Sequence, residues 1–148
     1  MKARALPIIV MTLLMSAVSP MYAVDLNRLY ESDYDSFWTK WRDAEKKAMS
    51  CTDYDMTARF LSNAILMLGN AEVSEANAKS VERLSLEKPR CLLESIQKLS
   101  AEDQIKFVKF FILTPLFHDG KEIIEVLEKH WNKYENIREL YWRLKQGS

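Results

Sequence analysis

The chain has 148 residues, with 21 basic and 21 acidic side chains and a formal net charge of zero. This balance argues against a nucleic-acid-binding protein, which needs a clustered positive surface to displace counterions. It also leaves no polybasic segment for a membrane surface, and the length suits one domain with a modest hydrophobic core.

The first 23 residues are predicted to be a secretory signal peptide. Lys2 and Arg4 precede an apolar core at residues 6–14, and Ala23 offers a small residue for cleavage, with Ala17 as a second candidate. A membrane anchor is the alternative, but the apolar stretch is shorter than the roughly 20 residues that span a bilayer. We therefore expect a periplasmic or secreted protein without stable membrane insertion.

Residues 24–148 are expected to form a single helical domain. Only two prolines, Pro89 and Pro115, and three glycines follow residue 23, and so few helix breakers favour helices. Apolar residues recur at steps of three and four, which is the period of an amphipathic helix. In chain order, the expected helices fall within residues 35–50, 55–69, 74–86, 89–99, 101–114, 119–131 and 136–146.

The fold class that follows is all-α, an irregular single-domain bundle of about six or seven short helices. The stretches "LSNAILML" and "LLESIQKL" are each followed by a polar turn, a helix and a proline. This weak repeat predicts stacked helical hairpins, a solenoid-like form of the same bundle.

Capping residues predict where several helices begin and end. Asp33 or Asp35 would cap the first helix, Ser74 would open the third, and Ser100 would cap the fifth. Gly69 is predicted to end the second helix with a positive φ, and the helix after residue 88 would begin at a proline.

The two cysteines are predicted to form a disulfide bond. Cys51 lies between the first two expected helices, and Cys91 lies in the first turn after Pro89. An even cysteine count in an exported chain favours a disulfide. A reactive thiol at a helix N-terminus is the alternative for Cys91, but no motif ties His118 or His130 to it as a base.

No catalytic or metal-binding motif is recognised. Glu94 precedes Ser95, as the catalytic glutamate does in exported helical enzymes that cleave peptidoglycan, but their downstream glycine-rich motif is missing. Glu94 is therefore expected to be a solvated glutamate. His118 and His130 are twelve residues apart, outside any zinc-ligand spacing, and phosphate-binding loops are lacking, so no metal or cofactor is predicted.

We therefore predict a protein that acts by binding another protein and has no catalytic activity of its own. Acidic and aromatic side chains near helix ends are the expected contact residues, although helix dipoles also account for the acids before helices. The expected contact residues are Trp38, Asp53, Asp55, His118 and Asp119.

The small, exported, helical build is similar to that of periplasmic immunity proteins, which plug the active cleft of a secreted toxin. Two alternatives stay open. One is a periplasmic enzyme or small-ligand carrier that uses a groove between helices, with Glu94, His118 and Asp119 as its polar groups. The other is a structural subunit of an envelope assembly.

Overall fold

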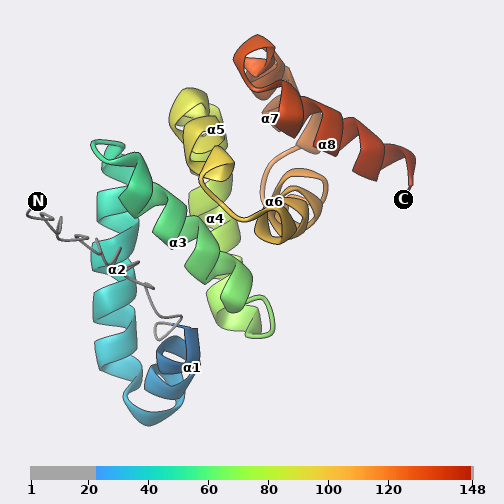
Figure 1. Ribbon diagram of the computed structural model, residues 1–148. Coiled ribbons are helices and arrows are strands. Elements are labelled where there is room, and N and C mark those ends of the chain that lie inside the picture. Colours follow the sequence, from blue (N-terminus) through green and yellow to red (C-terminus); the bar gives the residue numbers. More distant parts are fainter. Residues whose placement is uncertain (1–22, 148) are drawn as a thin grey trace, which may run out of the picture.

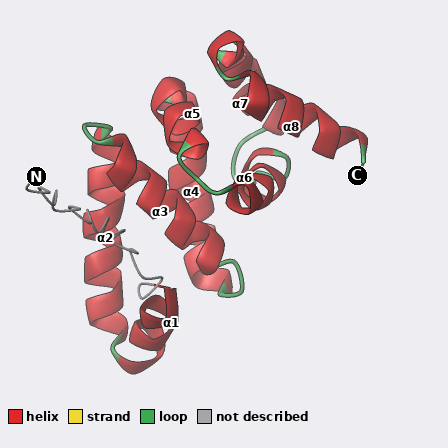
Figure 2. Cartoon of the chain, viewed as in Figure 1, coloured by secondary structure: helices red, strands yellow, loops and turns green. Residues whose placement is uncertain are grey.

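The computed structural model describes residues 23–147, and all regular secondary structure within this range is helical (Figures 1 and 2). The all-α fold class is confirmed, as a single unit with eight α-helices. The predicted signal peptide, apart from Ala23, lies outside the described residues. The elements are α1 (Ala23–Ser32), α2 (Tyr34–Ser50), α3 (Tyr54–Leu66), α4 (Ala71–Glu87), α5 (Pro89–Gln97), α6 (Ala101–Phe107), the π-helical segment η1 (Val108–Ile112), α7 (Gly120–Glu128), the 3-10 turn η2 (Trp131–Lys133) and α8 (Glu135–Gln146).

The first half of the chain has the arrangement of stacked helical hairpins. Helix α2 packs on α3 and α4, helix α3 packs on α4 and α5, and helix α4 packs on α5. Helix α7 then packs on α4 and α5, and α8 packs on α5 and η1. Helices α1 and α8 consequently lie at opposite ends of the molecule (Figure 1). No helix among residues 23–147 is long and apolar enough to cross a bilayer.

One hydrophobic core connects the elements from α2 to α8. Its side chains come from the apolar faces that the sequence period predicts, so the elements are held mainly by burial of hydrocarbon. A smaller cluster of Phe37, Met67 and Val73 receives Leu26 and Leu29 of α1. Members of the main core that are at most 1% exposed include Leu61, Leu84, Leu92, Phe107, Ile123 and Leu127.

Several predicted helix ends are confirmed. The carboxylate of Asp33 accepts a hydrogen bond from the backbone N–H of Ser36 at the start of α2, at 3.1 Å. Ser100 caps α6 by accepting from the N–H of Asp103, at 3.1 Å. Pro89 occupies the first turn of α5. A backbone N–H at that position would have no acceptor within the helix, so proline is tolerated there.

Two predicted helix ends are wrong. Helix α4 begins before Ser74, because the Asn70 side chain accepts from the N–H of Val73 and caps the helix one turn earlier. Gly69 does not have a positive φ. The left-handed residue is Cys51, with φ of 56° at the C-terminal end of α2.

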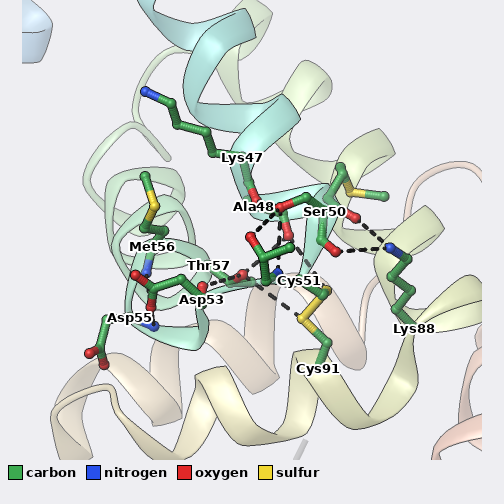
Figure 3. The surroundings of a disulfide bond; sticks show 12 residues. Lys47, Ala48, Ser50, Cys51, Asp53, Asp55, Met56, Thr57, Lys88 and Cys91 are labelled. Carbon is green, nitrogen blue, oxygen red and sulfur yellow. Dashed lines mark hydrogen bonds between the residues drawn. A yellow bond between two sulfur atoms is a disulfide. The ribbon is translucent and has the colours of Figure 1, made fainter.

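The predicted disulfide joins Cys51 and Cys91, with an S–S distance of 2.03 Å and a Cα–Cα distance of 6.0 Å (Figure 3). It ties the end of α2 to the first turn of α5. The Nζ of Lys88 donates to the carbonyls of Met49 and Ser50. These carbonyls lie in the last turn of α2, where no N–H of the same helix can reach them. The end of α2 is thus held to α5 by one covalent bond and by an ammonium group just before that helix.

Replacing both cysteines by alanine should lower the free energy of unfolding by about 4 kcal/mol. The disulfide closes a sequence separation of 40 residues, so the double variant has a less constrained unfolded chain. Urea unfolding of the oxidised wild type and the Cys51→Ala/Cys91→Ala variant measures the difference.

The left-handed backbone at Cys51 provides an internal control. Cys51→Gly/Cys91→Ala should be about 1 kcal/mol more stable than the alanine double variant, because glycine has no Cβ to clash at positive φ. Equal stability of wild type and both double variants would show that the cross-link does not support the fold.

Candidate protein-binding site

Helix α4 carries a carboxylate that is almost completely buried. Glu82 is 1% exposed. A buried carboxylate is costly unless hydrogen-bond donors surround it. The donors here come from one loop, residues 113–119, which connects η1 to α7 and is called the anchored loop below.

Three consecutive backbone N–H groups of the anchored loop converge on Glu82. Leu116 donates to Oε1 at 2.6 Å, and His118 donates to Oε2 at 2.7 Å. Phe117 donates to both oxygens, at 3.2 and 3.0 Å. The Nδ1 atom of His118 also lies 3.0 Å from Oε2. Successive N–H groups that point at one anion form a concave binding site for it, and this arrangement fixes the path of the loop backbone.

Small side chains flank Glu82 on its face of α4. Ala78 lies one turn before Glu82 and Ser85 lies one turn after it, so both share its face, and both are buried. Glu82 is not among the residues that the sequence predicts for the site, and a glutamate flanked by small residues on one helical face is the signal that points to it.

The anchored loop exposes two large apolar side chains. Leu116 is 64% exposed and Phe117 is 45% exposed, whereas their backbone N–H groups face inward to Glu82. Asp119 closes the loop by accepting from the N–H of Lys121 at 2.9 Å and thereby caps α7. The loop therefore holds an apolar pair at the surface on a backbone fixed at both its centre and its end.

The structure places two predicted contact residues, His118 and Asp119, in this loop. It does not join them to Glu94 through any hydrogen bond: Glu94 accepts from the hydroxyl of Tyr134 at 2.9 Å, on different elements. Within residues 23–147, no three His, Cys, Asp or Glu side chains are grouped as metal ligands. Glu94, His118 and Asp119, the polar groups expected for an enzyme or carrier, thus have different hydrogen-bond partners.

Asp53 lies near the disulfide bond, and Asp55 lies farther from it at the start of α3 (Figure 3). Asp53 caps α3 by accepting from the N–H of Asp55 at 2.8 Å, which is the dipole role expected of an acid before a helix. The carboxylate of Asp55 pairs with the Nζ of Lys98 at 2.8 Å, and this hydrogen bond lowers the pKa of Asp55.

Trp38 lies in an aromatic cluster near the start of α2. Its ring contacts those of Tyr34 and Trp41, with centroids 6.1 and 5.3 Å away. The hydroxyls of Tyr30 and Tyr34 donate to Glu72, and these hydrogen bonds lower the pKa of the Glu72 carboxyl. The length of α2 separates Trp38 from the acids at the disulfide by roughly 20 Å, so the predicted contact residues do not form one compact patch.

No protein-family model, curated protein or solved structure matches this chain.

Replacing Glu82 by glutamine should destabilise the protein by roughly 2 to 3 kcal/mol, because an amide NH₂ would replace one of the two acceptor oxygens and leave loop donors without a partner. Urea unfolding measures this, and hydrogen exchange should show faster exchange of the Leu116, Phe117 and His118 amides. Glu87→Gln on the exposed side of α4 is the control, with an expected change within about 0.5 kcal/mol. Unchanged amide protection in Glu82→Gln would contradict the anchoring role.

Tyr134 should ionise later than an ordinary tyrosine. Burial raises the pKa of Tyr134 to about 12, and its hydrogen bond to the Glu94 carboxylate adds to the increase. Because the pKa is raised in the folded state, the stabilisation is complete below about pH 10, the unfolded value, and is lost as the pH rises toward 12.

Near-ultraviolet phenolate absorbance tests this assignment. The latest-titrating phenol should be missing from Tyr134→Phe, and in Glu94→Gln it should titrate earlier but still above an ordinary tyrosine, because burial is the larger cause. An unchanged titration in Glu94→Gln would mean that the carboxylate does not act on this phenol.

Proposed function

We propose that the protein is exported and binds another protein without catalysis, with Leu116 and Phe117 of the anchored loop at the centre of the contact. The observation that carries this proposal is the combination of 64% and 45% exposure with a backbone that three consecutive N–H groups hold to buried Glu82. Exposed apolar side chains grouped on one loop indicate an interaction surface.

The rigidity of the anchored loop supports binding energetically. Association loses free energy when loops and side chains must be ordered, and a backbone that is already fixed avoids much of that loss. Large apolar side chains at the centre of an interface commonly dominate affinity once the surrounding contacts exclude water. Leu116 and Phe117 would then act as the anchors, and His118 and Asp119 would lie at the polar rim.

Export is supported by two independent features. Disulfide bonds persist mainly in oxidising compartments, and Cys51 and Cys91 are joined. The first 23 residues have the composition of a secretory signal peptide. The periplasm or the extracellular medium is therefore the compartment in which we place the binding partner.

A sharper form of the proposal is an immunity or inhibitor protein directed against a secreted toxin. A fixed loop with an apolar tip fits a concave surface, such as the active cleft of an enzyme, better than a flat one. This form requires no catalytic residue in the chain.

Chemical cross-linking in native extract tests the proposal with a matched pair of variants. Wild type and Leu66→Ser should capture the same protein in stoichiometric amount, because Leu66 is also exposed, at 42%, but lies on α3 outside the anchored loop. Leu116→Ser/Phe117→Ser should weaken this complex by about 2 to 4 kcal/mol. Circular dichroism and melting temperature confirm that both variants fold.

Identification of the captured protein as a secreted toxin would support the immunity form. Equal capture by all three proteins would exclude the anchored loop as the contact surface. A complex that contains only copies of this chain would instead favour a structural subunit.

A further inference from the structure

A groove of about 570 Å³ lies directly beside the anchored loop, between η1, α7 and α8. Leu113 and Thr114, the first two residues of the loop, line it, and so do Gly120 and Lys121, which directly follow the loop. The groove is therefore lined at both ends of the segment that carries the exposed pair Leu116 and Phe117. The remaining lining residues are Ile112, Ile124, Glu125, Glu128, Tyr141, Trp142 and Lys145.

The groove follows one face of α7 over nearly its whole length. Its lining on that helix runs from Lys121 to Glu128 at the three- and four-residue steps of a single helical face. This distance is about 10 Å, or two helical turns.

The inner surface of the groove is apolar. Ile112, Leu113 and Ile124 contribute aliphatic side chains, and Tyr141 and Trp142 contribute aromatic rings from α8. Trp142 is 40% exposed, so a large part of its indole is available for contact. Aliphatic side chains of a partner would gain hydrophobic burial here.

Charges of opposite sign flank the groove. Glu125 and Glu128 line it on α7, where Lys121 lies 3.8 Å from Glu125 and offsets one negative charge. On α8, the ammonium of Lys145 lies over the rings of Trp142 and Tyr141, at 5.0 and 5.5 Å from their centroids. The α7 side thus has an excess of one negative charge and the α8 side has one positive charge.

We propose that the groove binds two turns of an amphipathic helix from a partner protein. Apolar residues of that helix would face the groove, a basic residue would face α7, and an acidic residue would face α8. Peptides that bind by adding a strand need an exposed sheet edge, and residues 23–147 contain no strand. An apolar groove between helices is instead the kind of surface that binds the apolar face of an amphipathic helix.

This inference rests on the proposed function, because it assigns the groove to the same protein partner as the anchored loop. It adds the secondary structure and charge pattern of the partner segment. The groove volume is also in the range of small-molecule sites, so a small-ligand carrier is the competing outcome of the test.

The test selects displayed helical peptides of about 18 residues, long enough to form a helix alone, for binding to the processed full chain. Three positions at helical spacing vary among apolar residues, and each flank carries either lysine or glutamate. Enriched peptides should carry lysine on one flank and glutamate on the other, and should bind Trp142→Ala at least tenfold more weakly than wild type. They should bind Leu116→Ser/Phe117→Ser as they bind wild type.

Charge exchange determines the orientation of the bound helix. Glu128→Lys/Lys145→Glu alters two exposed residues and should prefer peptides with reversed flanks by about tenfold. Two results would overturn the helix assignment. One is enrichment of peptides without opposite charges on their two flanks, and the other is equal affinity of the peptides for wild type and Trp142→Ala. Loss of peptide binding only in the loop variant would also overturn it, while leaving the proposed function of the anchored loop intact.

Discussion

The hydrogen bonds between the carboxylate of Glu82 and the loop backbone determine how the second half of the chain is arranged. Glu82 belongs to α4, in the middle of the helical stack, and its donors are the N–H groups of Leu116, Phe117 and His118. The bonded residues lead directly into Asp119, which caps α7 at its start. Helix α7 forms one side of the groove, so the anchored loop and the groove both depend on one buried side chain.

A different constraint holds the first half of the chain. The Cys51–Cys91 bond joins α2 to α5 across two intervening helices, and Lys88 binds the carbonyls at the end of α2 (Figure 3). The chain is thus held covalently where the hairpins stack and electrostatically where the stack meets α7. The disulfide acts on α5, and the Glu82 hydrogen bonds act on α4. These two helices pack together, so a change that destabilises one helix should also destabilise the other.

The helices, several caps and the disulfide could be predicted because each leaves a local signal: a period of 3.6, an acid or hydroxyl before a helix, a pair of cysteines. Glu82 could not, because its partners are backbone N–H groups 34 to 36 residues away, and backbone groups carry no sequence identity. The predicted position of the left-handed residue was also wrong. Gly69 is the residue that tolerates positive φ most easily, but the chain reverses direction after α2, and Cys51 takes that conformation.

Anchoring and display of Leu116 and Phe117 are two results of one backbone path. Their N–H groups point to the buried carboxylate of Glu82, whereas their side chains are exposed. Leu116 and Phe117 could be buried only by turning the backbone and giving up their bonds to Glu82, which would leave a carboxylate in the interior without donors. Their exposure is therefore enforced by the interior of the protein, which is why we interpret the apolar pair as a binding surface and not as incompletely packed core.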